Sequence, residues 1–317
     1  MKRFFKKLIV FVIVILAVSL VIQGLVNIRM KHKVIYGCDN LDVEEGQYHD
    51  LVFLGSSRCY AHFSPVLFEQ QLGMSAINLG VDGHSELTMH KLRLLNYLAR
   101  NKAPRYAILN FDPLVWPGSI EDNDNMIIKD RYARYAFFPS SADAPIVDYF
   151  HFNFAEKYIP FYALLRYKLV PKCITLPNDK TWRMQRYNKV DDQWDTTVIS
   201  VRREEELMHS YFDTSEAGIK KLEVLLRSLD SICTNHGTRL ICVQTPVYKS
   251  IYLKRNFAIT GQICSQLRIP FIDVNKEDID TNIDYFYNAN HLNTKGVAAM
   301  TKELCSDSSF RKLLKPV

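Results

Sequence analysis

The sequence lacks the short motifs that mark metal, redox and nucleotide sites. Its seven cysteines are scattered and include no CxxC pair, which argues against both a disulfide framework and a zinc site. Its nine histidines include no HExxH pair, and His84 and His90 are six residues apart, the wrong spacing for one helix face. Neither GxGxxG nor GxxxxGK[ST] occurs, which argues against a nucleotide-binding α/β protein. We therefore expect no metal ion and no cofactor.

Acidic residues are missing from the first 33 positions, which carry seven basic residues. Removing these seven charges from the formal net charge of +6 leaves −1 for residues 34 to 317. A nucleic-acid-binding protein would need a basic face on its folded part, so we expect no nucleic-acid partner. Nearly half of the residues (48%) are apolar, which is enough for a sizeable core.

Charge is also absent from residues 8 to 28, an apolar run that basic residues flank. At ~1.5 Å per residue this run spans about 31 Å as a helix, close to the ~30 Å hydrocarbon layer. A cleaved signal peptide is the alternative, but the run is long for one and no small-x-small cleavage site follows. The basic residues favour a cytoplasmic N-terminus and an extracytoplasmic folded part, in the periplasm or at the cell surface. We expect a membrane anchor at 1–33 and an acidic tether at 34–50.

Beyond the tether, apolar strand-like runs alternate with helix-like segments. Strands are predicted at 51–55, 76–80, 106–111, 238–246 and 269–274. Helices are predicted at 64–73, 85–100, 215–237 and about 250–267, with a last helix from near Asn293. Such alternation implies a parallel sheet with helices on both faces. The predicted fold class is α/β, a doubly wound, flavodoxin-like sheet of five strands in a domain of residues 51–317.

The alternation stops between about residues 112 and 213, which indicates an insert of roughly 100 residues after the third strand. The insert holds all three tryptophans, Trp116, Trp182 and Trp194, and several aromatic clusters. One interpretation is a cap whose aromatic side chains form a small core of its own. The other is that some of these rings line a substrate groove, where they stack on sugars or hold acyl chains.

Polar residues follow the predicted strands at the edge where a doubly wound sheet binds its ligands. Gly55-Ser56-Ser57 follows the first strand, NLGVDG (78–83) the second and Asn110 the third, and His291 lies in the loop after the fifth. A hydroxyl, backbone amides, a carboxamide and an imidazole are the nucleophile, oxyanion donors and general base of an acyl-transfer site. The other interpretation of the two serines is a polar turn in which one hydroxyl caps the next segment.

These blocks, in this order, resemble the SGNH hydrolases, also called the GDSL esterase and lipase family. GSSR places Ser57 in the position of the family's serine, NLGVDG places Gly83 in that of an oxyanion glycine, and YNANHLNTKG supplies His291. The resemblance covers about residues 51–111 and 214–306. It implies that Ser57 is the nucleophile, that His291 is the base and that the amides of Ser57 and Gly83 hold the oxyanion.

Two blocks depart from the family's pattern. Asn288 stands three residues before His291, where the family has aspartate. A carboxamide can accept a hydrogen bond from the imidazole but carries no charge, and in trypsin the same replacement lowers the rate by about 10⁴ through the wrong tautomer. Asp284 is the alternative partner for His291 if its loop folds back. The other interpretation of Asp284 is a solvated carboxylate in a turn. In the third block, LNFDP offers Asn110 either as an oxyanion donor or as a strand-end side chain bonded to backbone.

Three further residues have two interpretations each. Arg58 either binds an anionic substrate group or, as we favour, pairs with a carboxylate at the sheet edge. His84 either lines the pocket or faces solvent at a helix start. Asp112, next to Pro113, is a turn residue rather than a catalytic acid.

The resemblance and the anchor together predict a membrane-anchored serine esterase or O-acyltransferase. Its substrate would be acylated cell-envelope carbohydrate or another envelope polymer, and its mechanism a Ser-His covalent acyl-enzyme. The chain also resembles extracytoplasmic relatives that modify teichoic acids and alginate, which implies a multi-pass membrane acyltransferase as the partner that feeds a transferase. The alternative, supported by Asn288, is a catalytically inactive relative that binds glycan or scaffolds an envelope complex.

Overall fold

The computed structural model describes residues 1–31, 33, 45–82, 87–111, 126–178, 180, 185–197, 215–249 and 254–315. The chain divides into two compact units. The smaller contains Met1–Val43 and Ile120–Asp179, and the larger contains Glu44–Ser119 and Lys180–Val317. Most of the predicted tether and both ends of the predicted insert lie outside the described residues.

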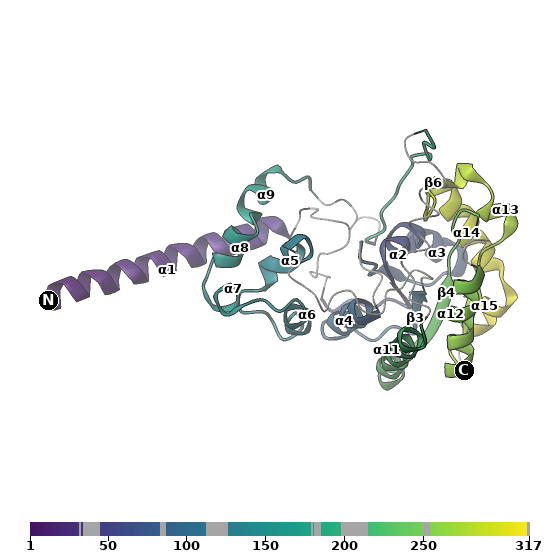
Figure 1. The fold of residues 1–317 in the computed structure, drawn as a ribbon, viewed down its shortest axis with the longest axis horizontal. Coiled ribbons are helices and arrows are strands. Elements are labelled where there is room, and N and C mark those ends of the chain that lie inside the picture. The colour runs from purple at the N-terminus through teal and green to yellow at the C-terminus, as the bar shows by residue number, and fades with distance from the viewer. Residues whose placement is uncertain are drawn as a thin grey trace. The chain divides into compact units, whose positions relative to one another are not determined.

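The larger unit is built on a five-stranded parallel sheet, which confirms the predicted α/β fold class (Figure 1). Its strands are β1 (Leu51–Leu54), β2 (Ala76–Asn78), β3 (Tyr106–Asn110), β4 (Arg239–Gln244) and β5 (Phe271–Asp273), in the order β2-β1-β3-β4-β5. Each lies within one of the predicted strand segments. The direction of winding reverses between β1 and β3, so a ligand crevice is expected beyond the carboxyl ends of these two strands.

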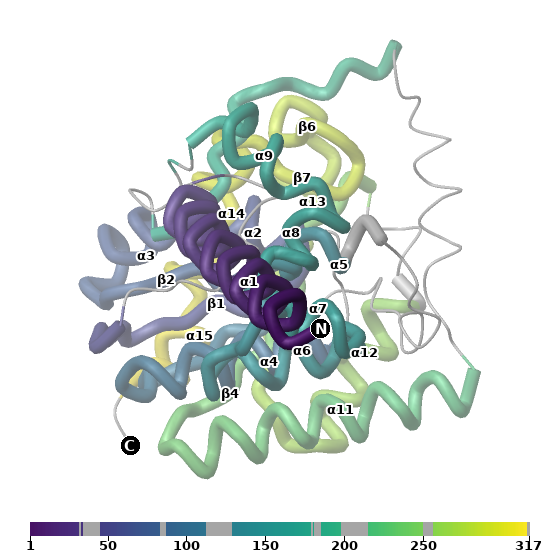
Figure 2. The backbone as a smooth tube through the Cα atoms, turned by 90° about the vertical axis from the view of Figure 1, so that its left-hand side faces the viewer, coloured from purple at the N-terminus to yellow at the C-terminus, as the bar shows by residue number. Residues whose placement is uncertain are grey.

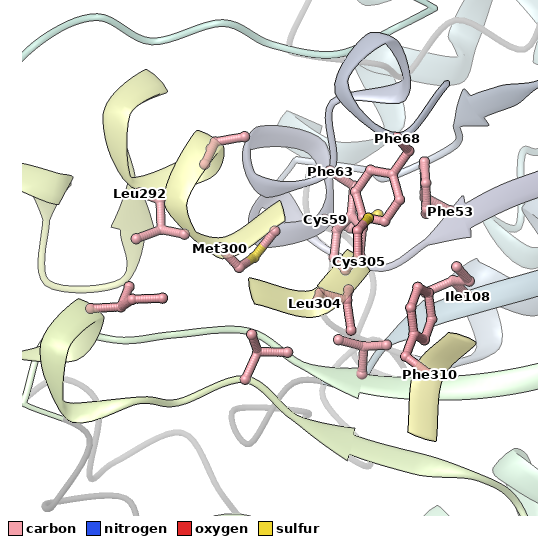
Figure 3. Packing of buried hydrophobic residues seen from close by; sticks show 14 of the residues in the cluster. Phe53, Cys59, Phe63, Phe68, Ile108, Leu292, Met300, Leu304, Cys305 and Phe310 are labelled. Atoms are coloured by element: carbon pink, nitrogen blue, oxygen red, sulfur yellow. The ribbon is translucent and has the colours of Figure 1, made fainter. Parts of the chain in front are cut away.

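Helices cover both faces of this sheet. One face is packed against α3 (Pro65–Leu72), α14 (Thr294–Ser306) and α15 (Ser308–Leu313), and the other against α4 (Leu87–Leu98) and α11 (Glu216–Asn235). A sixth helix, α12 (Lys254–Leu267), lies beside β5 and α11. On the first face Phe53, Phe63 and Phe68 pack with Met300 and Leu304 in one buried cluster (Figure 3).

Local sequence signals set the ends of the helices nearest the predicted site. Pro65 occupies the first position of α3, where its missing N–H costs nothing, and Gly73 ends that helix in the left-handed conformation with φ 67°. Asn293 caps α14 by accepting the N–H groups of Lys295 and Gly296. His291 lies two residues before this cap.

The smaller unit contains α1 (Lys2–Met30), which is long and apolar enough to cross a membrane, with a mean hydropathy of 3.0 over 18 residues. The unit also contains α5 (Met126–Tyr132), a 3-10 turn (Ala133–Tyr135), α6 (Ala144–Tyr149), α7 (Phe154–Tyr158), α8 (Tyr162–Arg166) and α9 (Leu169–Thr175). The aromatic residues of the predicted insert are divided between the units. Phe150 contacts Tyr132 and Phe152 in the smaller unit, whereas Tyr187 and Trp194 belong to the core of the larger one.

Candidate active site

Ser57 and His291 meet although 234 residues separate them. Ser57 Oγ lies 2.8 Å from His291 Nε2. Ser57 is the first residue of α2 (Ser57–His62), which starts directly after β1, and His291 opens β7 (His291–Leu292), the partner of β6 (Phe286–Asn288) in a small antiparallel hairpin. Both residues are of intermediate exposure. The structure therefore brings the predicted nucleophile and base together at the end of β1.

The two adjacent serines have different partners. Ser56 is the N-cap of α2, and its Oγ accepts the Arg58 N–H at 3.2 Å, whereas the Ser57 hydroxyl reaches His291. Gly55 makes this turn possible, because its φ of 151° disfavours a side chain and a Cβ there would lie 2.6 Å from that of Cys59. The N–H of Ser57 belongs to the first turn of α2, whose amides have no carbonyl partner within the helix.

The start of the NLGVDG segment seats α2. The Asn78 side-chain NH₂ donates to the carbonyls of Cys59 and Phe63, both at 2.8 Å. Gly80 lies so close to α2 that a Cβ would stand 2.6 Å from the Tyr60 nitrogen. The second block thus positions the helix that carries Ser57. Gly83, the predicted oxyanion glycine, and His84 lie outside the described residues.

Asn288 orients the imidazole ring of His291. Asn288 Oδ1 lies 2.9 Å from His291 Nδ1 and also accepts the backbone N–H groups of Asn290 and His291, each at 3.0 Å. A backbone N–H can only donate, so these two groups select the oxygen of the carboxamide, not its NH₂, for this position. The hydrogen-bond network therefore assigns the proton to Nδ1 and the lone pair to Nε2, which faces Ser57. This is the tautomer that a general base requires.

Asp284 has a different place. It lies exposed in the 3-10 turn Ile283–Tyr285, and its backbone carbonyl accepts the side-chain NH₂ of Asn293 at 2.8 Å. Of the two candidate partners for the base, Asn288 is the one that faces His291 Nδ1. Tyr287, the residue before Asn288, stacks against the His291 ring, with centroids 5.3 Å apart and planes 19° apart.

A buried network behind Ser57 contains His62, a histidine that the sequence analysis did not single out. His62 Nε2 accepts the Leu292 N–H at 2.9 Å, so its Nδ1 carries the proton and donates it to Thr245 Oγ1 at 2.9 Å. Thr245 Oγ1 in turn donates to Asn110 Oδ1 at 3.0 Å. His62 ends α2 and Leu292 follows His291, so the bond between His62 and Leu292 connects the helix of Ser57 to the strand of His291.

Arg58 and Asn110 belong to the same network. The Arg58 guanidinium donates to Thr245 Oγ1 at 2.8 Å and to the carbonyls of Thr245 and Pro246. Both Arg58 and Asn110 are almost completely buried, so they line the back of the site rather than its opening. Thr245 and His62 were missed because neither belongs to a family block, although Thr245 follows the fourth strand at the same sheet edge as the other candidates.

Residues 185–197 connect the two sides of the site. The backbone carbonyl of Gln185 accepts the Asn78 N–H, and that of Val190 accepts the Thr294 N–H. The N–H of Asn188 donates to the Tyr60 carbonyl, and the N–H of Trp194 donates to the Phe286 carbonyl. The segment thus runs from β2 and α2 to the hairpin of the base. No sequence pattern marked it.

Burial and charge shift the titration of the site. Burial, followed by the nearby Arg58 charge, lowers the pKa of His291 from 6.5 to about 3. Burial also lowers the pKa of His62 well below its usual value. Both rings are therefore neutral at pH 7, and His291 Nε2 is free to accept a proton from Ser57. In the described part of the chain, no group of three His, Cys, Asp or Glu residues could hold a metal ion.

Comparison with known proteins adds little to this geometry. No family model and no curated protein matches the sequence. Among solved structures, a proposed acylhydrolase from Bacteroides fragilis is 11% identical with a TM-score of 0.38, over 89% of this chain and 96% of that one. A GDSL-like lipase from Bacteroides thetaiotaomicron is 12% identical with a TM-score of 0.35, over 83% and 88%. Because the identities and TM-scores are this low, we derive the chemistry from the geometry of the site itself.

The bond between His62 and Leu292 leads to a testable prediction. His62→Gln keeps one acceptor and one donor in similar positions, whereas His62→Ala removes both and leaves the buried Leu292 N–H without its acceptor, at a cost of about 1–3 kcal/mol. We expect His62→Ala to lower the melting temperature and slow the reaction of Ser57 with a fluorophosphonate, and His62→Gln to retain most of both. Equal behaviour of the two variants would contradict a positioning role for His62.

Proposed function

We propose that the chain is a membrane-anchored serine esterase or O-acyltransferase of the SGNH type, acting on acyl groups of cell-envelope carbohydrate. The observation that carries the chemistry is the 2.8 Å contact between Ser57 Oγ and an imidazole nitrogen whose lone pair faces it. The position of this pair, beyond the end of β1 beside the β1/β3 switch point, supports the proposal. The anchor α1 and the sequence resemblance support an envelope substrate.

In the proposed reaction His291 Nε2 takes the Ser57 proton while Oγ attacks the acyl carbonyl. The negative charge that develops on the carbonyl oxygen is held by backbone amides, that of Ser57 and, by resemblance, that of Gly83. His291 then gives its proton to the departing alcohol, leaving the acyl group as an ester of Ser57. Water as the second nucleophile regenerates the enzyme as an esterase, and a sugar hydroxyl makes it a transferase.

The cellular arrangement is part of the proposal. The basic residues at the start of α1 favour an N-terminus in the cytoplasm, with the larger unit outside it. A transferase would need an acyl donor at that surface, and a multi-pass membrane acyltransferase is the class of partner that supplies one.

The proposal predicts covalent labelling at one serine. We expect a fluorophosphonate to modify Ser57 of the full-length chain in detergent micelles, and mass spectrometry to locate the adduct. Ser57→Ala abolishes labelling, and His291→Ala reduces it strongly because no base remains. Ser56→Ala is the matched control, since it removes a hydroxyl one residue away at a cost of about 1 kcal/mol in capping but leaves Ser57 and His291 intact. An unlabelled but folded parent chain would contradict the proposal and favour the glycan-binding scaffold.

The Asn288 side chain gives a second prediction. Asn288→Asp retains an acceptor for all three N–H groups and adds a negative charge, which raises the pKa of His291 and stabilises its protonated form. A charge pair at about 5 Å and an effective dielectric constant of about 20 gains about 3 kcal/mol, so we expect labelling to accelerate by about tenfold or more. Asn288→Ala leaves the ring without its acceptor and should slow labelling. The account is wrong if Asn288→Asp labels more slowly than the parent.

A further inference from the structure

Within the uncharged run 8–28 of α1, the polar side chains lie on one face. Ser19, Gln23 and Asn27 are spaced four residues apart, which places them on the same side of the helix. Within the smaller unit this side is covered, because Gln23 is 4% exposed whereas Leu25 is 63% exposed. The Phe161 N–H donates to Gln23 Oε1 at 2.9 Å, and Gln23 Nε2 donates to Asn27 Oδ1 at 3.2 Å. The polar atoms of α1 thus bind the segment between α7 and α8.

Further hydrogen bonds fasten the same group of helices to the end of α1. Arg29 Nε donates to the Cys173 carbonyl in α9 at 2.8 Å, and Lys33 Nζ donates to the Leu176 carbonyl at 2.8 Å. Figure 1 shows α7, α8 and α9 beside the C-terminal part of α1, and Figure 2 shows the same grouping with the N-terminus toward the viewer. These helices are therefore held at the level where α1 would leave the hydrocarbon layer.

The depth of this attachment follows from helix geometry. A layer of ~30 Å that begins at Leu8 ends about 20 residues later, near Ile28, at ~1.5 Å per residue. Gln23 then lies about 7 Å inside the boundary, which is within the ~5–10 Å to which interfacial helices sink.

The helices attached at this level expose large apolar side chains. Phe154 is 74% and Phe138 65% exposed, and the ring of Tyr158 contacts both, with centroids 4.9 Å and 5.6 Å away. Ile159 and Tyr162 are exposed beside them. We call these five residues the aromatic surface. Aromatic side chains are enriched at the level of lipid headgroups, where an apolar ring and a polar tip are both accommodated.

We propose that the aromatic surface is inserted into the headgroup region of the same bilayer that α1 crosses, so that the smaller unit lies in the membrane interface. The inference rests on the proposed membrane anchoring and is independent of the acyl chemistry. Lipid covers the aromatic surface, because the hydrogen bonds of Gln23 and Arg29 in α1 hold this surface at the interfacial level. The protein would then be attached to the membrane both by the spanning helix α1 and by the short interfacial helices beside it.

Depth-dependent fluorescence quenching tests the proposal. Phe154→Trp adds an indole to the aromatic surface of the full chain, which is reconstituted into phosphatidylcholine vesicles containing a lipid brominated near either the carbonyl or the methyl end of its acyl chain. Val224→Trp is the matched control, since Val224 is 57% exposed on α11 of the other unit. We expect the carbonyl-end bromolipid to quench the fluorescence added by Phe154→Trp, and the methyl-end bromolipid to quench it less. We expect the fluorescence added by Val224→Trp to be retained with both lipids.

Two readouts on the same samples separate the possible failures. Flotation with the vesicles reports anchoring, and fluorophosphonate labelling of Ser57 reports the acyl chemistry. A chain that floats and labels but whose Phe154→Trp fluorescence is quenched no more than that of Val224→Trp overturns the interfacial position alone. A chain that does not float overturns the anchoring and this inference with it, whether or not Ser57 is labelled.

Discussion

The backbone N–H groups of Asn290 and His291 determine which end of the Asn288 carboxamide faces the imidazole. Because they can only donate, the oxygen is held in place and the Nδ1 proton of His291 has its acceptor. The Nε2 lone pair is then directed at Ser57, 2.8 Å away. Asn288 therefore gives His291 the tautomer that a general base requires, but it brings no negative charge.

The missing charge has a chemical consequence. Burial and the charge of Arg58 lower the pKa of His291 to about 3, so the imidazole stays neutral and its protonated form is a stronger acid than an ordinary imidazolium. Such a ring removes the serine proton with difficulty but returns a proton to a departing alcohol readily. In the proposed reaction we therefore expect His291 to hold the Ser57 proton only briefly before it passes to the departing alcohol. Hydrogen bonds of His62 and of residues 185–197 hold Ser57 and His291 in place for that transfer.

Much of the fold and part of the site were predictable from the sequence. The five strands, both ends of α3 and the start of α14 follow from apolar runs and from residues that act locally, such as Pro65, Gly73 and Asn293. Ser57 and His291 follow from their places after strands. The roles of His62 and Thr245, the seating of α2 on Gly80 and the stripe of Gln23 against Phe161 depend on contacts between distant segments, so no local pattern contains them. The amide orientation of Asn288 likewise depends on the turn that its own loop adopts.

The tautomer of His291 is the central claim, and nitrogen NMR of the full-length protein in lipid nanodiscs measures it most directly. With ¹⁵N-labelled histidine, and His291→Gln to assign the signals, the account predicts a proton on Nδ1 and an unprotonated Nε2 from about pH 8 down to about pH 5, well below the ordinary histidine pKa of about 6.5. A proton found on Nε2, or a ring that becomes charged near pH 6.5, would contradict it.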